Sequence, residues 1–167
     1  LRKIIEEYNL VELLGGYFEQ RDLGLFLDLA VYSIIAENNA AQYYPDYTYN
    51  HPLFTNGMKQ YSDSTVSDFL NSVTDDQSIG FLNSWNETRN HREKIYISYD
   101  STNKNCQAGD IEMVGFGHPK VDVGQPVFNY AVAYDTHNQE PLFYEKYPGS
   151  LNDISQLQFM LDKAFGY

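Results

Sequence analysis

The pattern of apolar residues changes its period near residue 93, and this change limits the chain to folds that combine helices with a sheet. Within residues 22–37, apolar residues recur at intervals of three and four, the spacing of one buried helix face. Residues 94–100 are instead β-branched and aromatic, which favours a strand. The sequence therefore predicts an α+β chain, with a helical N-terminal region over residues 1–92 followed by a sheet-containing region over residues 93–167.

Further helices are predicted in the first region from capping residues and apolar spacing. One helix is expected to begin at Ser64, with Val66 and Phe69 on one side. Another is expected after residues 74–76, whose side chains can cap a helix N-terminus. Residues 43–52 hold two prolines and several turn-forming residues, which predicts a loop.

The second region has the pattern of three strands followed by a helix. The strands are expected over residues 94–100, 127–134 and 142–147. Residues 101–124 are polar and contain glycine, which predicts a long loop, whereas the short turn 135–139 joins the last two strands as a hairpin. A helix is expected after residues 148–149, with Ser150 or Asn152 as its cap.

Composition narrows the classes of protein further. The single cysteine, Cys106, excludes an internal disulfide and a cysteine-rich zinc site. No apolar run approaches the ~18 residues of a membrane helix, and no secretory signal opens the chain, so we expect a cytoplasmic protein without a membrane partner. The net charge of −12 counts against a nucleic-acid-binding surface, which is usually basic. The first residues lack a methionine and have the pattern of mid-helix, so we expect a piece of a longer protein.

Asp100 is the best single candidate for chemistry. It ends the predicted strand and precedes two hydroxyl residues, and a carboxylate fixed there can bind a hard cation such as Mg²⁺. The ordinary alternative is an aspartate that starts a turn through its side chain. Two-metal phosphoryl chemistry needs several carboxylates around ions ~3.5–4 Å apart, so one carboxylate does not make a site.

Two other features are less specific. Lys120 follows a glycine-aromatic-glycine segment and can either contact a phosphate as a point charge or remain solvated. The tyrosines within residues 43–49 can either stack on bases or sugars, or fold their rings back onto their own helices. The four histidines show no spacing typical of metal ligands.

Four segments, in this order and spacing, carry a resemblance to one known family. They are Tyr99-Asp100-Ser101-Thr102, the glycine-aromatic-glycine loop that ends in Lys120, the hairpin over residues 127–147, and Tyr147-Pro148-Gly149 with Asp153 leading into a helix. Residues 22–167 resemble DDE-type insertion-sequence transposases, in the branch with a large helical N-terminal region.

The resemblance implies a partial ribonuclease-H-like catalytic core over residues 93–167, which begins with three antiparallel strands and a helix. It implies that Asp100 is the first catalytic residue and a ligand of Mg²⁺ or Mn²⁺, and that Ser101, Thr102 and Lys120 contact DNA. The second Asp and the third carboxylate of the family lie beyond this sequence, so the resemblance implies a fragment that is inactive alone. The implied parent protein acts as a homo-oligomer on transposon-end DNA, which it cleaves and transfers.

Two other functions fit the same residues. One is a ribonuclease-H-like nuclease that is not a transposase. The other belongs to a different class: an acidic, tyrosine-rich, non-catalytic module that binds carbohydrate or protein.

Overall fold

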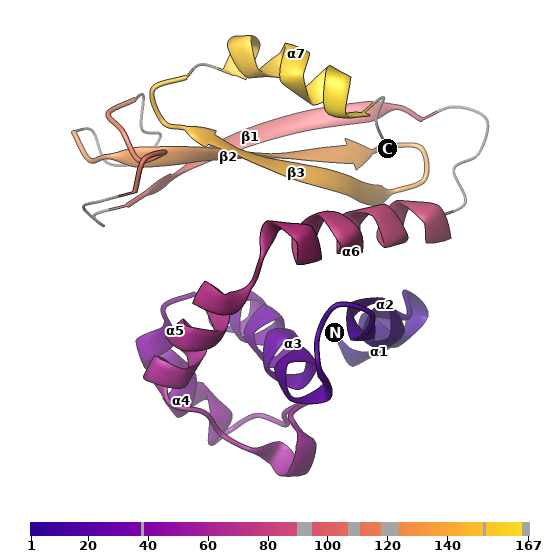
Figure 1. The fold of residues 1–167 in the computed structure, drawn as a ribbon, viewed down its shortest axis with the longest axis vertical. Helices are drawn as coiled ribbons and strands as arrows, with labels where there is room; N and C mark the ends of the chain where they lie inside the picture. Colours follow the sequence, from indigo (N-terminus) through magenta and orange to yellow (C-terminus); the bar gives the residue numbers. More distant parts are fainter. Residues whose placement is uncertain (38, 90–94, 107–110, 118–123, 152, 165–167) are drawn as a thin grey trace. The chain divides into compact units, whose positions relative to one another are not determined.

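The computed structural model describes residues 1–37, 39–89, 95–106, 111–117, 124–151 and 153–164 (Figure 1). It contains helices and a three-stranded antiparallel sheet, which confirms the α+β class. The chain divides into two compact units, which we call the helical unit (Leu1–Ser84) and the sheet unit (Trp85–Tyr167). The boundary predicted between residues 92 and 93 lies outside the described residues. No helix in the described part of the chain is long and apolar enough to cross a membrane.

The helical unit is built from short helices and one longer helix, α3. The helix predicted over residues 22–37 is confirmed as α3, and the helices predicted at Ser64 and after residues 74–76 are confirmed as α5 and α6. The helices in chain order are α1 (Arg2–Glu7), α2 (Leu10–Gly15), α3 (Gln20–Ile35), η1 (Ala41–Tyr43), α4 (Tyr44–Thr48), η2 (Asn56–Met58), α5 (Asp63–Ser72) and α6 (Asp75–Thr88). The boundary between the two units falls within α6, after Ser84.

Side-chain caps explain where α5 and α6 begin. At α5, the Ser62 hydroxyl accepts a hydrogen bond from the Thr65 N–H at 3.3 Å. At α6, the Thr74 hydroxyl accepts from the Gln77 N–H at 3.2 Å, while the Gln77 side-chain oxygen accepts from the Thr74 N–H at 2.9 Å. This reciprocal pair is a capping box, and it satisfies donors that the first turn of a helix leaves without backbone partners.

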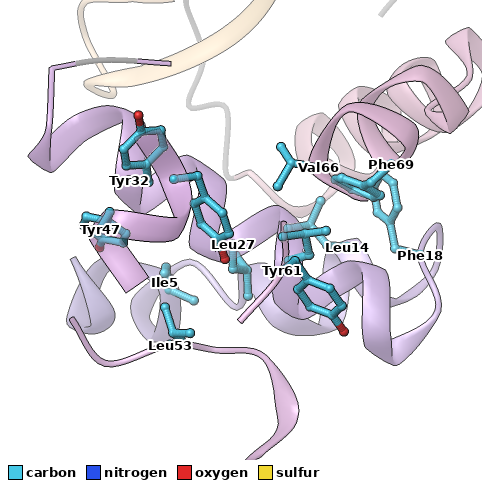
Figure 2. Packing of buried hydrophobic residues seen from close by; sticks show 12 residues of the cluster. Ile5, Leu14, Phe18, Leu27, Tyr32, Tyr47, Leu53, Tyr61, Val66 and Phe69 are labelled. Carbon is cyan, nitrogen blue, oxygen red and sulfur yellow. The ribbon is translucent and has the colours of Figure 1, made fainter. Parts of the chain in front are cut away.

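Buried apolar and tyrosine side chains form one core in the helical unit (Figure 2). The ring of Phe18 lies 5.2 Å from the ring of Phe26 and 6.1 Å from that of Phe69, measured between centroids. Full burial of a side chain of this size stabilises the fold by about 1.5–3 kcal/mol. The labelled members are Ile5, Leu14, Phe18, Leu27, Tyr32, Tyr47, Leu53, Tyr61, Val66 and Phe69.

Helix α3 also holds the segment around Thr55 through polar contacts. The two carboxylate oxygens of Asp28 accept hydrogen bonds from the backbone N–H groups of Phe54, at 2.6 Å, and Thr55, at 3.0 Å. One turn earlier, Gly24 allows the helix backbone to approach, since a Cβ at that position would lie 2.8 Å from the Thr55 Cα. Gly24 and Asp28 together therefore fix this segment without leaving its buried N–H groups unpaired.

The predicted loop over residues 43–52 is partly wrong, because Tyr44–Thr48 form the helix α4. Pro45 lies in the first turn of α4, where a backbone N–H would have no helical partner in any case. The Thr48 hydroxyl donates to the Pro45 carbonyl at 2.6 Å. The proline is therefore accommodated in the first turn of a helix here instead of excluding one.

The sheet unit contains three antiparallel strands in the order β1-β2-β3, followed by a helix (Figure 1). The elements are β1 (Ile97–Asn105), β2 (Val127–Asp135), β3 (Glu140–Pro148) and α7 (Asp153–Ala164). The predicted order of strand, strand, strand and helix is confirmed, as is the hairpin that joins the last two strands. The pairing of β2 with β3 shifts register between Ala133 and Tyr134.

The two faces of the sheet differ in burial. Buried residues alternate with more exposed residues along β2, so the two sets point to opposite faces. The buried set is Val127, Asn129, Ala131, Ala133 and Asp135. We call this side the helix face, because α7 lies over it, with Met160 buried and Lys163 paired with Glu145 of β3 (Figure 1).

Asp135 organises the turn between β2 and β3. One of its carboxylate oxygens accepts from the backbone N–H groups of Tyr96, His137 and Asn138, at 3.4, 2.9 and 3.3 Å. Its other oxygen accepts from the Asn138 side-chain amide at 2.6 Å. The carboxylate thus fixes the hairpin turn and also ties the segment before β1 to the end of β2.

Candidate functional site

Asp100 lies within β1 and not at its end. It is the fourth of the nine residues of β1 and is paired with Val132 of β2. The predictions that the strand ends at Asp100 and that residues 101–124 are all loop are therefore wrong. Residues 101–105 continue the strand because the β2 backbone supplies a hydrogen-bonding partner whatever the side chains are. The alternative in which Asp100 starts a turn is wrong for the same reason.

The three candidate residues on β1 divide between the two faces of the sheet. Asp100 is exposed and points away from the helix face, since its partner Val132 belongs to the more exposed set of β2. Thr102 lies two residues further and shares that side, whereas Ser101 is half-buried and points to the helix face. The structure therefore brings Asp100 and Thr102 together and separates Ser101 from them.

The rest of the predicted site is not assembled by the described residues. Lys120 lies outside them, so its proximity to Asp100 stays a prediction. Within the described part of the chain, no group of three or more His, Cys, Asp or Glu residues lies close enough to hold a metal ion. Asp100 thus offers one carboxylate, and a Mg²⁺ ion with one such ligand keeps most of its water.

The tyrosines of residues 43–49 divide between the core and the surface. Tyr44 and Tyr47 are buried, and their rings lie 5.7 and 5.2 Å from the ring of Tyr32. Burial, with a smaller contribution from Asp28, raises the pKa of Tyr44 far above its usual range, so its hydroxyl stays protonated. Tyr43 and Tyr49 are exposed. The structure therefore agrees with rings that fold back onto their own helices for two of the four tyrosines.

Two buried aspartates have perturbed pKa values of opposite direction. Burial raises the pKa of Asp28, because the hydrogen bonds from Phe54 and Thr55 only partly offset the loss of water. Burial acts in the same direction at Asp135, but the hydrogen bonds from Asn138, His137 and Tyr96 outweigh it and lower the pKa of that carboxyl. Asp135 therefore remains ionised in the folded protein at neutral pH.

Sequence reasoning missed both of these aspartates, although each leaves a signal. Asp28 is a charged residue between two leucines in a strongly apolar helix, which indicates a buried carboxylate with local donors. Asp135 begins a turn that contains Asn138, a combination typical of side-chain-stabilised turns. Both carboxylates bind backbone N–H groups of their own unit, so their role is structural and Asp100 remains the candidate for chemistry.

Comparisons with protein-family models, with curated proteins and with solved structures found no match to this chain. The case for a function therefore rests on the residues themselves and on the elements that carry them.

Proposed function

We propose that this chain is the N-terminal and early catalytic part of a DDE-type DNA transposase with a ribonuclease-H-like core, and that Asp100 is its first metal ligand. The observation that carries the proposal is the exposed carboxylate of Asp100 in the middle of β1, an end strand of the order β1-β2-β3. A strand fixes its side chains more firmly than a loop does, as a metal ligand requires.

The arrangement of elements supports the same proposal. In a ribonuclease-H-like fold, three antiparallel strands are followed by a helix and then by a fourth strand, which lies beside the first and carries the second Asp. The order β1, β2, β3, α7 agrees with the first part of that sequence, and β1 is at the end of the sheet where a fourth strand would pair. The proposal therefore places the remaining ligands in the chain that follows Tyr167.

The residues of this chain have limited roles in the proposed chemistry. Asp100 supplies a hard carboxylate oxygen, which suits Mg²⁺ or Mn²⁺ and fits a site completed by further carboxylates. Thr102, on the same side of β1, can donate a hydrogen bond to a nearby phosphate oxygen. The bound ions would supply activation of the attacking hydroxyl and stabilisation of the leaving oxygen in an in-line displacement at phosphorus.

A non-catalytic tyrosine-rich module has less support. This alternative rests on the tyrosine cluster of residues 43–49, of which Tyr44 and Tyr47 are part of the helical core. A ribonuclease-H-like nuclease that is not a transposase shares every feature described for β1, and the DNA product distinguishes the two, since only a transposase joins the cleaved end to a second DNA.

The proposal is tested with the protein encoded by the whole reading frame, a labelled duplex carrying the transposon end, and Mg²⁺ or Mn²⁺. We expect Asp100→Asn to reduce cleavage and strand transfer by more than about a hundredfold, since it removes a metal ligand. Glu112→Gln is the matched control, because it removes the same charge from an exposed carboxylate of the sheet unit. Activity retained in Asp100→Asn would contradict the proposal, and the 167-residue chain alone is expected to be inactive.

A further inference from the structure

The face of the sheet that points away from the helix face has an unusual composition. It carries aromatic side chains from β2 and β3 and lysines from β1 and β3. We call this side the tyrosine face, defined by Lys104, Phe128, Tyr130, Tyr134, Tyr144 and Lys146, with Asp100 and Thr102 on the same side. The described charges on it sum to +1, from two lysines and one aspartate, in a chain whose net charge is −12.

The register of the strands places the lysines directly beside the aromatic rings. Tyr130 is paired with Lys146 of β3 on one side and with Thr102 of β1 on the other. Phe128, two residues earlier in β2, is paired with Lys104. Paired residues on neighbouring strands lie on the same face about 5 Å apart, so each of these two rings has a lysine as a direct neighbour across the sheet.

Polar groups on the two faces are used differently. On the helix face, Lys163 pairs with Glu145, and the Asn129 side chain donates to the carbonyls of Pro148 and Leu151 at 3.2 and 3.0 Å. On the tyrosine face, Lys104 and Lys146 are exposed, and within the described ranges no hydrogen bond or ion pair joins the side-chain ammonium group of either lysine to another residue. Their charges are therefore available to a ligand.

The aromatic side chains on this face are accessible as well. Tyr134 and Tyr144 are 37% and 38% exposed, and Phe128 and Tyr130 are half-buried. A core tyrosine such as Tyr147, on the helix face, is only 2% exposed. A ring that is fixed on one side by the sheet and open on the other presents a flat surface for stacking.

We propose that the tyrosine face binds single-stranded nucleic acid, with unpaired bases stacked on its rings and phosphates beside Lys104 and Lys146. Stacking on aromatic rings together with contacts to phosphates is the common chemistry of single-strand binding. Phe128 and Tyr130 lie two residues apart, or about 7 Å along the strand, which suits successive bases of an extended strand. A duplex keeps its bases stacked on one another, so it cannot use these rings.

The proposed binding does not depend on a metal at Asp100. The carboxylate of Asp100 lies on the same face and repels phosphates when no cation is bound, so Asp100→Asn should strengthen binding of a single strand in the presence of a chelator. A negative result for the proposed metal site at Asp100 and a negative result for binding by the tyrosine face can therefore be told apart.

The test is fluorescence anisotropy of a 5′-labelled oligothymidylate of about 12 nucleotides with the 167-residue chain, at about 50 mM salt with EDTA. We expect Tyr144→Ala and Tyr130→Ala to weaken binding by at least about fivefold each, and Tyr130→Phe to retain it because the ring remains. Lys146→Ala should reduce the slope of log K against log salt by about 0.7. The matched controls are Tyr49→Ala and Phe159→Ala. They remove exposed rings from the residue that follows α4 and from α7, and they should leave the affinity for the oligonucleotide unchanged.

Four outcomes would overturn the proposal. The first is no saturable binding of the oligonucleotide by the unaltered chain. The second is equal weakening of binding by the control variants, and the third is tighter binding of a duplex of the same length. The fourth is displacement of the oligonucleotide by a neutral soluble glycan, which would assign the rings to carbohydrate. Near-ultraviolet circular dichroism of each variant establishes whether the protein is folded. If Tyr130→Ala is not folded, the test rests on Tyr144→Ala and on the retained binding of Tyr130→Phe.

Discussion

Each unit of this protein buries one aspartate, and the two behave in opposite ways. Asp28, in the helical unit, is 1% exposed and Asp135, in the sheet unit, is 0% exposed. Burial raises the pKa of Asp28, whereas at Asp135 the hydrogen bonds overcome the effect of burial and lower the pKa. Two aspartates that are both closed to solvent thus differ in the balance between loss of water and hydrogen bonding.

The difference comes from the balance between loss of water and hydrogen bonding at each carboxylate. Asp28 accepts from two backbone N–H groups, and the Thr55 side chain and the Arg2 charge also favour its ionised form, yet the loss of water outweighs all of these. At Asp135, three backbone N–H groups and one side-chain amide outweigh a smaller loss of water.

The largest expected effect tests the apolar core of the helical unit. Phe69→Ala should lower the free energy of unfolding by about 4 kcal/mol, because it leaves a cavity beside Phe18. Leu70→Ala is the matched control on the same helix, since Leu70 is exposed, and it should cost less than about 1 kcal/mol. Urea unfolding followed by far-ultraviolet circular dichroism measures both. Equal losses from the two variants would show that this core is not well packed.

The next prediction compares the two aspartates directly. Asp135→Ala should cost about 3 kcal/mol, because it leaves four donors without an acceptor, and Asp28→Ala about 2 kcal/mol, because the loss of its hydrogen bonds is partly offset by removal of a carboxyl group whose burial is costly. The single tryptophan, Trp85, reports on the sheet unit, since its indole N–H donates to the Pro141 carbonyl at 2.7 Å. A larger loss of stability from Asp28→Ala would contradict this balance between burial and hydrogen bonding at the two carboxylates.

A smaller effect is expected from the close approach of α3 to Thr55. Gly24→Ala should cost about 1–2 kcal/mol despite the higher helix propensity of alanine, because the added methyl group would press on the Thr55 backbone. At Gly15, the last residue of α2, a Cβ would meet nothing within 4 Å. Gly15→Ala should therefore be neutral or stabilise by about 0.5 kcal/mol. Thermal unfolding of both variants checks this, and a stabilising Gly24→Ala would show that Thr55 lies further from α3.

The smallest effect is a pH dependence of opposite sign at the two aspartates. The lowered pKa of Asp135 means that its contribution to stability is present above the unfolded value of 3.8 and is lost as the pH falls through the folded pKa. The raised pKa of Asp28 means that its contribution is full below pH 3.8 and is lost as the pH rises through the folded pKa. The cost of Asp135→Asn should therefore shrink on acidification, and that of Asp28→Asn should shrink as the pH rises.

Urea unfolding of both variants and the unaltered chain between about pH 2.5 and 7 measures these trends. The same direction of change in both variants would contradict the assigned pKa shifts.

The elements that could be predicted from sequence are those in which the spacing of apolar residues matches the buried face of the element. Helix α3 and the hairpin of β2 and β3 have apolar residues at the period of their structure, so the pattern alone indicates them. Residues 101–105 of β1 are polar, and they form a strand only because β2 supplies a paired backbone, which no local pattern reports. Pro45 favours a loop by residue type but lies in the first turn of α4, because the effect of proline on a helix depends on its position in that helix.

The candidate site shows the same division. The type of residue at Asp100 and its place on a strand could be predicted, but its position in the middle of β1 could not, since that depends on the length of the pairing with β2. The tyrosine face was not predicted either. Its lysines and rings come from three strands, and only the register places Lys146 beside Tyr130 and Lys104 beside Phe128.

The proposed role of Asp100 is tested most directly by the coding DNA that follows the codon for Tyr167. We predict that it encodes an apolar strand carrying an Asp within a few codons, and a Glu much further on, which would complete the metal site that Asp100 begins. A stop codon directly after Tyr167, or a continuation with no such strand, would contradict the proposal and leave Asp100 an exposed residue of an end strand.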